Sequence, residues 1–331
     1  METSYLNKSF NLNKKIYRVG TDCSGLDSPI YALKMLNVNV KHIWSCDNDP
    51  DIKNQILNTL QPENYYDDMF NRDVAKLPPI DIYIAGIPCQ SWSGLNTKRQ
   101  GFDVKTGTLF FEAFKVIKQL NPKYFILENV IGLLTHNKGK SYKLIQSYLE
   151  TLEIYNIAYK VFNTADYGIP QNRNRIYIIG VRNDIKFNNK LFNVPTIPIS
   201  DTSIRQFLNI NLPSQREKCL IPRREKCLEF AKQHYGINEA DDWIITIGSS
   251  LTFTRAKLNI CPCITTCSQF YYITSQERFL TINELLQLQG FPSNYKLITK
   301  SKQKCHRQIG NAMSVNVLYH LFYALLGNRS E

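Results

Sequence analysis

The stretch Asp81–Ser93, DIYIAGIPCQSWS, runs from an apolar segment into a turn that carries a cysteine. The segment Asp81–Ala85 predicts a buried strand, because branched and aromatic side chains dominate it and Gly86 and Pro88 follow it. A thiol just beyond a strand can be a nucleophile if its pKa is lowered. A buried structural cysteine is the commoner role for this residue type, so the segment alone leaves both roles open for Cys89.

Four apolar runs outside this stretch also have the length and composition of strands. They are Ile16–Thr21, His42–Asp47, Tyr124–Glu128 and Ile176–Val181. Helical spacing of apolar residues between Phe110 and Leu120 predicts a helix that leads into the run at Tyr124. This alternation predicts an α/β fold in which helices cover a mostly parallel sheet.

Ligands bind such sheets at the carboxyl ends of the strands. Gly25 follows the first predicted strand, Asp47 ends the second, Cys89 follows the third and Glu128 ends the fourth. We therefore expect these four residues to lie along one edge of the sheet.

The regular pattern stops at about residue 184, where prolines and clusters of charge replace it. Order returns at Thr281, which forms a capping box with Glu284 at the start of a helix that Gly290 ends. The predicted organisation is a catalytic and cofactor-binding domain at 1–183, completed by 305–331. A smaller irregular module with a hinge is expected at 184–304.

The charge balance favours a polyanionic partner. The chain of 331 residues has 40 Lys and Arg against 28 Asp and Glu, a net charge of +12. Each phosphate contact by such a surface releases counterions from a nucleic acid. The N-terminal residues lack the apolar segment of a signal peptide, and Val317–Leu326 is too short to span a bilayer.

The cysteines indicate a reducing, intracellular compartment, because they are odd in number (9) and scattered along the chain. Nucleus and cytoplasm both remain open. Cys261, Cys263 and Cys267 form a C-x-C-x₃-C pattern, but zinc sites usually pair cysteines with wider spacing in two clusters. We interpret them as strand cysteines and expect no metal site.

Two polar motifs adjoin later strands. Glu128, in Glu128-Asn129-Val130, is either a surface ion or a buried acid whose raised pKa lets it donate a hydrogen bond. Arg173 and Arg175 precede the strand at Ile176 and are either edge-strand charges or donors that point into a cleft.

Five motifs together resemble the DNA cytosine-5 methyltransferase family. In chain order they are Pro88-Cys89-Gln90, Glu128-Asn129-Val130, Gln171-x-Arg173-x-Arg175, Arg278–Glu284 with Leu288–Pro292, and Gln308–Ala312. The resemblance covers nearly the whole chain outside 184–275. It implies a Rossmann-like S-adenosylmethionine-dependent methyltransferase sheet with a smaller target-recognition domain.

The resemblance also implies a chemistry. Cys89 would add to C6 of cytosine, which makes C5 nucleophilic toward the methyl group of S-adenosylmethionine. Glu128 would hold the N3 edge of the base, Arg175 would bind its O2, and Arg173 would support the loop near the nucleophile. The base must then leave the helix. A segment at Ser91–Thr106 would close over it, and the residues implied there as DNA contacts are Gln90, Ser91, Trp92, Ser93, Lys98 and Arg99.

The expected cofactor site departs from the family pattern. The family usually has Asp-x-Phe-x-Gly-x-Gly where this chain has Thr21–Asp27, so Cys23 replaces the aromatic residue and Asp27 the second glycine. Asp47 would accept from the ribose hydroxyls, and Asp73 from the adenine amino group. The full set of expected cofactor residues is Thr21, Cys23, Ser24, Gly25, Leu26, Asp47, Asn48, Asp73, Val74, Pro88, Leu109, Asn311 and Ala312.

Double-stranded DNA is the expected partner of a monomeric enzyme, and Arg255 and Lys257 in the module are expected to contact it. Two alternatives remain open. One is a cytosine-5 methyltransferase acting on tRNA, although the Cys-Phe-Thr motif typical of that branch is absent. The other is a catalytically silent DNA-binding member of the family. A nicotinamide-binding enzyme is disfavoured, because Gly-x-Gly-x-x-Gly does not follow the first strand.

Overall fold

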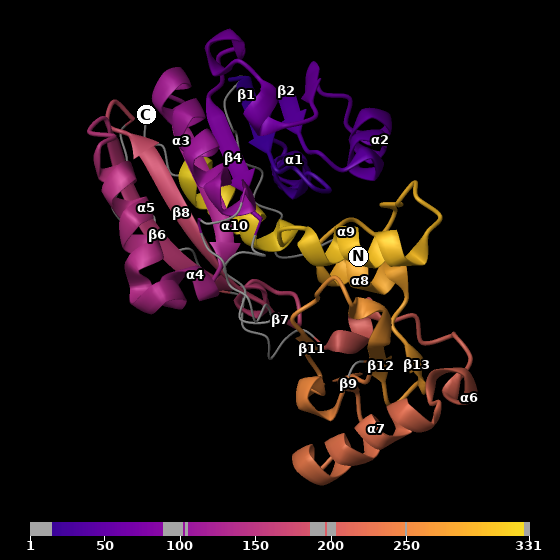
Figure 1. Ribbon diagram of the computed structural model, residues 1–331. Helices are drawn as coiled ribbons and strands as arrows, with labels where there is room; N and C mark the ends of the chain where they lie inside the picture. The colour runs from indigo at the N-terminus through magenta and orange to yellow at the C-terminus, as the bar shows by residue number, and fades with distance from the viewer. Residues whose placement is uncertain are drawn as a thin grey trace.

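The computed structural model describes residues 15–88, 102, 105–185, 196, 203–248 and 250–327. A large sheet with helices on both faces forms the upper part of the molecule, and a smaller unit lies below it (Figure 1). The large sheet has seven strands in the order β3-β2-β1-β4-β5-β8-β6. They are β1 (Tyr17–Asp22), β2 (Val40–Cys46), β3 (Asn64–Tyr66), β4 (Ile82–Gly86), β5 (Tyr124–Val130), β6 (Tyr155–Asn163) and β8 (Asn174–Arg182).

The five predicted strands are confirmed as β1, β2, β4, β5 and β8. The pairs from β3 to β5 are parallel, whereas β8 runs antiparallel to both β5 and β6. β3 and β6 were not expected. β3 has three residues, too few for a pattern, and β6 exposes several side chains along its length, so its apolar signal is weak.

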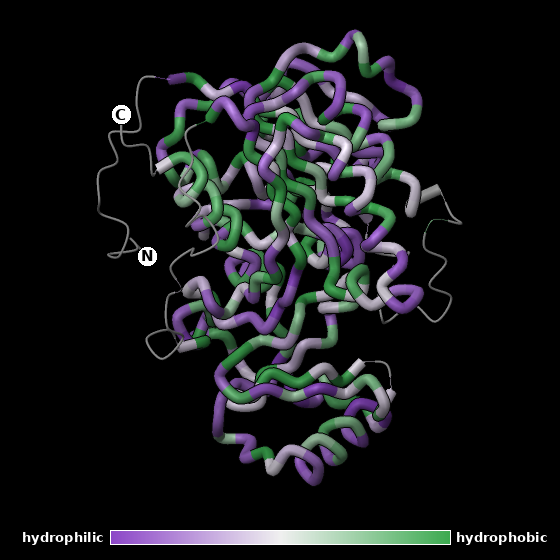
Figure 2. The backbone as a smooth tube through the Cα atoms, turned by 90° about the vertical axis from the view of Figure 1, so that its left-hand side faces the viewer, coloured by the Kyte–Doolittle hydropathy of each residue, from purple (hydrophilic) through white to green (hydrophobic). Residues whose placement is uncertain are grey.

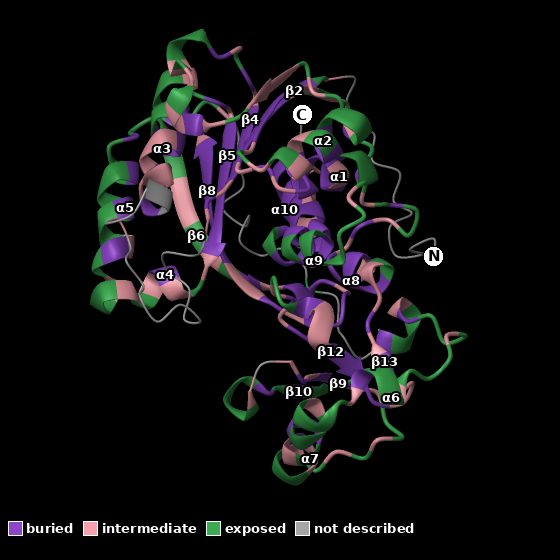
Figure 3. Cartoon of the chain, turned by 45° about the vertical axis from the view of Figure 1, so that its right-hand side comes forward, coloured by how far each residue is buried: buried purple, intermediate pink, exposed green. Residues whose placement is uncertain are grey.

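Helices cover the sheet in two layers, with α3 and α5 on one side and α1 and α10 on the other (Figure 3). The buried side chains of β4 alternate between these layers, Ile82 and Ile84 facing one and Tyr83 and Ala85 the other. The helices are α1 (Ser28–Met35), α2 (Pro50–Thr59), α3 (Leu109–Leu120), α5 (Lys140–Glu150) and α10 (Val315–Gly327). The predicted helix after Phe110 is confirmed as α3.

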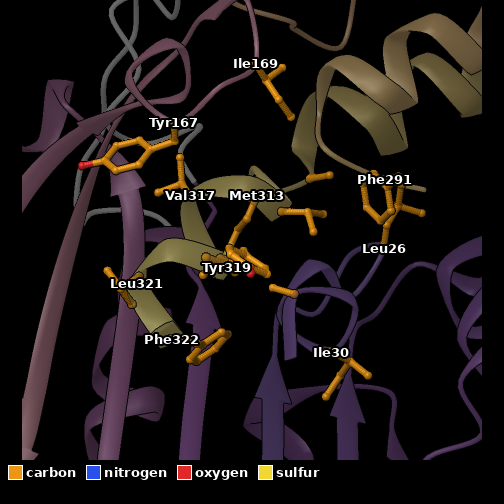
Figure 4. Close-up of a cluster of buried hydrophobic side chains, with 14 of the residues drawn as sticks. Leu26, Ile30, Tyr167, Ile169, Phe291, Met313, Val317, Tyr319, Leu321 and Phe322 are labelled. Atoms are coloured by element: carbon orange, nitrogen blue, oxygen red, sulfur yellow. The ribbon is translucent and has the colours of Figure 1, made fainter. Parts of the chain in front are cut away.

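The C-terminal helix α10 packs against the start of the chain. Figure 4 shows α10 side chains such as Phe322 in one buried cluster with Leu26, Ile30 and Phe291. The stretch Lys302–Gly327 is long and apolar enough to cross a membrane, but 83% of its most apolar window is buried inside the molecule. The apolar side chains of this stretch therefore belong to the buried core of the protein.

The smaller unit has a sheet of its own with the order β10-β9-β12-β13. Its main elements are α6 (Arg216–Cys219), α7 (Pro222–Tyr235), β9 (Trp243–Thr246), β10 (Ala256–Leu258), β12 (Tyr271–Ile273) and β13 (Arg278–Phe279). A separate apolar cluster that includes Leu228 and Ile245 holds α7 against this sheet. Along the backbone tube, hydrophobic stretches run through the strands while α7 alternates hydrophobic and hydrophilic residues (Figure 2).

A pair of short strands and a helix join the units. The short strands β7 (Gln171–Asn172) and β11 (Cys261–Pro262) pair in parallel. Helix α8 (Ile282–Leu288) begins at the predicted capping box of Thr281 and Glu284, which is confirmed. Leu285 and Leu288 of α8 are buried in the apolar cluster that contains α1 and α10, so part of the expected hinge packs with the large unit. Helix α9 (Lys302–Asn311) then leads into α10.

Candidate active-site cleft

A cleft of about 390 Å³ opens at the carboxyl ends of the parallel strands. Its walls are formed by residues of β2, β4, β5 and β8, by the segments that follow β1 to β4 and precede β8, and by residues of α2, α3 and α9. The expected residues that line it are Cys23, Gly25, Asp47, Asn48, Pro88, Leu109, Glu128, Arg173, Arg175 and Asn311. The expectation that such residues meet at one edge of the sheet is confirmed for Gly25, Asp47 and Glu128.

The loop after β1 has an unusual backbone. Cys23, Gly25 and Asp27 have φ values of 47°, 52° and 56°, in the left-handed region that glycine adopts most easily. A Cβ atom at Gly25 would meet no atom within 4 Å, so the absence of a side chain there leaves space in the cleft wall. Burial raises the pKa of Cys23, and its Sγ lies 3.6 Å from the Met69 sulfur.

Asp27, at the end of this loop, is fully buried. Its Oδ2 accepts hydrogen bonds from the Ser45 hydroxyl at 2.6 Å and from the Thr21 hydroxyl at 3.2 Å. The carboxylate therefore ties the start of the loop and β2 to the start of α1.

Asp47 holds the next loop in place. Its Oδ2 accepts from the Gly25 amide at 2.9 Å, and its Oδ1 accepts from the Asp49 amide at 3.0 Å. Burial raises the pKa of Asp47, with these two backbone hydrogen bonds acting in the opposite direction. The loops after β1 and β2 are thus joined through one carboxylate that also lines the cleft.

Asp73 and Val74 do not line the cleft, contrary to the expectation for the adenine contacts. The Asp73 side chain is 55% exposed, lies 3.6 Å from the Lys76 ammonium and accepts from the Ala75 amide. Asp68 and Met69 line the cleft instead. Both lie just beyond the carboxyl end of β3, where a parallel sheet places its ligand-binding residues. The sequence did not predict this position because it did not predict β3.

A buried ion pair fixes the position of this segment. The Asp22 carboxylate accepts from the Arg72 guanidinium, from the Tyr83 hydroxyl at 2.6 Å and from the Trp44 indole at 3.2 Å. The Arg72 side chain is only 4% exposed and lies over the rings of Trp44 and Tyr66. The turn that precedes Arg72 is therefore anchored to the end of β1.

Glu128 of β5 and Arg175 of β8 face each other at the end of the cleft opposite Asp47. The Arg175 Nε lies 3.2 Å from Oε1 of Glu128, and both side chains are largely buried. Burial raises the pKa of Glu128, although Arg175 and Arg173 act to lower it. Of the two open interpretations of Glu128, the structure favours the buried acid over the surface ion.

Cys263 lies between the two arginines. Its Sγ is 3.8 Å from Arg173 and 3.9 Å from Arg175. Burial acts to raise the pKa of this thiol, but the two guanidinium groups outweigh it and the pKa lies below its ordinary value. The thiolate is therefore the form that this pair of cations stabilises.

Arg173 is fully buried and joins three parts of the chain. Its guanidinium donates to the carbonyl oxygens of Ile264 at 2.8 Å, Ala312 at 2.8 Å and Gly310 at 3.3 Å. Neither arginine is an exposed edge-strand charge. Arg173 instead connects the large sheet to α9 and to the segment after β11.

Several expected cofactor residues lie behind the cleft wall. Thr21, Leu26 and Ala312 are at most 2% exposed and do not line it, and the Ser24 hydroxyl bonds the backbone carbonyls of Thr21 in β1 and Cys46 in β2. Their contribution is to shape the wall. Arg255 and Lys257 are exposed on the smaller unit, where the Arg255 guanidinium donates to the Thr252 and Thr254 carbonyls. The described residues include no metal-binding group of three His, Cys, Asp or Glu side chains.

The expected nucleophile lies outside the described residues. The same holds for the expected DNA contacts around it, which are Gln90, Ser91, Trp92, Ser93, Lys98 and Arg99. The last described residue before Cys89 is Pro88, which lines the cleft together with Gly86 and Ile87. Asp49, Ile52, Arg307 and Gln308 also line the cleft but are not among the expected cofactor residues, although Gln308 begins the motif that contains Asn311.

The fold and this cleft define a Rossmann-like methyltransferase. A family model described as C-5 cytosine-specific DNA methylase matches residues 23–327. The chain belongs to the C-5 cytosine-specific DNA methylase family.

Relatives in bacteria are named type II methyltransferases. M1.ScrFI of Lactococcus lactis subsp. cremoris is 31% identical over 78% of this chain, which spans 65% of that protein's length. M.NgoBI of Neisseria gonorrhoeae is 31% identical over 77% of each chain. M.HhaI of Haemophilus parahaemolyticus is 29% identical over 75% of this chain and 76% of its own.

Solved structures share the fold at lower identity. The Entamoeba histolytica methyltransferase EhMeth superposes with a TM-score of 0.69 at 17% identity, over 96% of this chain and 100% of that chain. The structure of the S. pombe Dnmt2 methyltransferase gives a TM-score of 0.63 at 19% identity, over 94% of this chain and 98% of that chain.

Proposed function

We propose that the protein is a DNA cytosine-5 methyltransferase that uses S-adenosylmethionine and acts on a flipped-out cytosine. The observation that carries this proposal is the cleft itself. Asp47 and Gly25 lie at one end, Glu128 and Arg175 lie at the other, and the segment that leads to Cys89 lines the wall between them.

The residues at the β1 and β2 end fit a nucleoside cofactor. Gly25 leaves room for close backbone approach, and Asp47 offers carboxylate oxygens suited to ribose hydroxyls. Asp68 offers a further carboxylate, and Met69 and Ile52 give apolar surface for a purine ring. When bound, S-adenosylmethionine supplies an electrophilic methyl group on a sulfonium centre.

The residues at the β5 and β8 end fit a cytosine. A Glu128 carboxyl group with a raised pKa can donate a hydrogen bond to N3 and stabilise negative charge that develops on the ring. The Arg175 guanidinium lines the cleft beside Glu128 and suits the carbonyl oxygen O2. Arg173 already donates to three backbone carbonyls, so its role is to hold this end of the cleft together.

Cys89 supplies the nucleophile in this proposal. Its thiolate would bond to C6, and the electron pair of the C5–C6 double bond would then attack the sulfonium methyl group, which releases S-adenosylhomocysteine. Loss of the C5 proton to water would re-form the double bond and expel the thiolate. The reaction needs a base removed from the helix, because the faces of a stacked base are covered.

Double-stranded DNA is the proposed substrate and a monomer the proposed active form. The names of the bacterial relatives and the exposed Arg255 and Lys257 of the smaller unit support DNA. tRNA is the competing substrate, because base flipping does not distinguish the two polymers.

The test is transfer of tritiated methyl groups from S-adenosylmethionine to unmethylated genomic DNA and, in parallel, to total tRNA. Bisulfite sequencing then locates the modified cytosines. Label in DNA at one recurring cytosine context is the expected result. Label confined to tRNA would replace the substrate, and absence of label in both, with no cofactor binding, would favour a catalytically silent protein.

A further inference from the structure

The segment between Glu128 and Glu150 carries basic side chains and no acidic one. It contains three lysines, Lys138, Lys140 and Lys143, and no Asp or Glu. All three lysines are exposed. In the described part of the chain, salt bridges form at several other lysines but at none of these three. The segment therefore presents positive charge that no described acid balances.

The lysines lie at the same edge of the large sheet as the cleft. β5, which carries Glu128, ends at Val130, and the short helix α4 (Gly132–Thr135) comes next. Lys138 follows α4, whereas Lys140 and Lys143 lie in the first turn of α5. Figures 1 and 3 show α4 at the end of the large unit nearest to the smaller unit. The basic side chains are therefore close to the proposed base end of the cleft.

The turn that carries Lys138 has a strained backbone. Asn137, Lys138 and Gly139 have φ values of 49°, 55° and 83°, so two residues with a Cβ atom adopt the left-handed region. A hydrogen bond of 2.7 Å between the His136 ring and the Ser141 hydroxyl closes the turn. Such strain persists where the surrounding structure fixes it, and it occurs most often at functional sites. The turn therefore holds the backbone of Lys138 in one conformation.

The start of α5 lies beside β6, the outermost strand of the sheet. The rings of Tyr142 in α5 and Tyr159 in β6 meet edge to face, with their centres 4.9 Å apart. Only β8 separates β6 from β5, and two strand spacings are about 10 Å. Along a DNA duplex this is about three base pairs, because the phosphates of one strand are about 3.4 Å apart along the axis. The lysines are therefore placed for phosphates that flank a base bound at Glu128.

The chemistry of these side chains suits the backbone of a nucleic acid. Lysine ammonium groups bind phosphates as point charges, and tyrosine hydroxyls also contact them. Lys140 and Lys143 are three residues apart and are neighbours on the surface of α5. Tyr159 beside them is 50% exposed. The charges are spread along a surface, which suits the repeated phosphates of a polymer.

We propose that Lys138, Lys140 and Lys143 bind the phosphate backbone of the duplex next to the target cytosine. This inference rests on the proposed function, because it takes double-stranded DNA as the partner. It adds a DNA-binding surface on the large unit, separate from Arg255 and Lys257 on the smaller unit. Because phosphates carry no base identity, this surface contributes affinity and leaves sequence preference to other residues.

The test measures how the affinity for a duplex depends on salt. Glutamine at all three positions (Lys138→Gln, Lys140→Gln and Lys143→Gln) removes three charges and keeps polar side chains. Fluorescence anisotropy gives the dissociation constant of a labelled duplex of mixed sequence over a range of salt concentrations. Each lost phosphate contact lowers the slope of log K against log salt by about 0.9, so we expect weaker binding and a slope shallower by about 2–3. The double variant without the change at Lys138 avoids the strained turn and should show about two thirds of this decrease.

A matched control removes the same charge at the opposite edge of the sheet. Lys34 and Lys118 are exposed in the last turns of α1 and α3, and Lys41 is exposed near the start of β2. Glutamine at these three positions should leave the salt slope unchanged. Both triple variants change exposed side chains away from the cofactor end of the cleft. Their thermal midpoints and their affinities for S-adenosylhomocysteine, measured by calorimetry, should therefore equal those of the wild type.

An unchanged slope in the first triple variant would overturn the inference. An equal decrease in both triple variants would show an effect of net charge and would overturn it as well. Both results leave the proposed function in place. A decrease measured with tRNA but not with the duplex would assign the three lysines to RNA and reject DNA as their ligand. Failure of the wild-type chain to bind the duplex at any salt concentration would overturn DNA as the proposed partner together with the inference.

Discussion

The Asp27 carboxylate accepts a hydrogen bond from the Thr21 hydroxyl at 3.2 Å, across the loop that follows β1. These two residues stand where the family pattern has its aspartate and its second glycine. The chain therefore replaces the family's acid with a threonine but brings a buried carboxylate back to that threonine from six residues further on. The acid is therefore supplied by Asp27 in place of residue 21, but a carboxylate still lies at the end of β1.

Removal of the Asp27 carboxylate should destabilise the fold. Asp27→Gly suits the φ of 56° and deletes the acceptor for Thr21 and Ser45, so the free energy of unfolding should fall by about 1.5–3 kcal/mol. Urea denaturation measures this. The double variant Thr21→Asp with Asp27→Gly restores the family arrangement and should recover part of the loss. No recovery would show that the two positions are not equivalent.

Cys89→Ser should abolish methyl transfer and retain cofactor binding. A hydroxyl is a far weaker nucleophile toward C6 than a thiolate at neutral pH. Tritium transfer measures activity, and calorimetry with S-adenosylhomocysteine measures binding. Cys267→Ser, at an exposed cysteine away from the cleft, is the control and should keep full activity. Transfer by Cys89→Ser at the wild-type rate would exclude Cys89 as the nucleophile.

The protonation of Glu128 should be visible in the pH dependence of stability. Because its pKa is raised in the folded state, the native protein holds this proton more tightly than the unfolded chain does. The contribution of Glu128 to stability therefore falls as pH rises from the ordinary value of 4.5 through the folded-state pKa. The difference in unfolding free energy between Glu128→Gln and the wild type should shift in favour of the variant over that range. A difference independent of pH would contradict the raised pKa.

Cys263 and Cys23 should react with iodoacetamide at different rates near neutral pH. Both thiols are next to the cleft, but the arginines lower the pKa of Cys263 whereas burial raises that of Cys23. The thiolate is the reactive form, so Cys263 should be alkylated first. Peptide mass spectrometry after timed quenching gives the order. Faster labelling of Cys23 would mean that the two guanidinium groups do not govern Cys263.

Alanine in place of Arg255 or of Lys257 should weaken DNA binding, and the way in which it does so identifies the kind of contact that was lost. Alanine at either position removes an exposed cation, and loss of a phosphate contact lowers the dependence of affinity on salt by about one unit of the logarithmic slope. Loss of a base contact instead costs about 1–3 kcal/mol at the cognate site and relaxes specificity. Fluorescence anisotropy against cognate and scrambled duplexes over a range of salt separates the two. Unchanged binding in both variants would place the DNA surface elsewhere.

The alternation of strands and helices was enough to predict the core of the sheet, because a buried parallel strand is a short apolar run with clear ends. Asp68 was missed for a physical reason. The three-residue strand β3 before it is too short to leave a pattern in the sequence. Without that strand, the sequence motif alone led to Asp73. The roles of Arg173 and Gln171 depend on carbonyls and amides contributed by distant segments, which no local sequence signal describes.

Segments from the two ends of the described chain meet beside the cleft. The Ser28 hydroxyl donates to the Met313 carbonyl at 2.8 Å, and α10 covers the face of the sheet that β1 and α1 begin. During synthesis, residues near the N-terminus leave the ribosome first, at about 5–20 residues per second. The apolar face that they contribute therefore stays unburied until α10 has emerged. A ribosome that stalls before residue 315 would release a chain with an uncovered sheet, which is a substrate for chaperones and proteases.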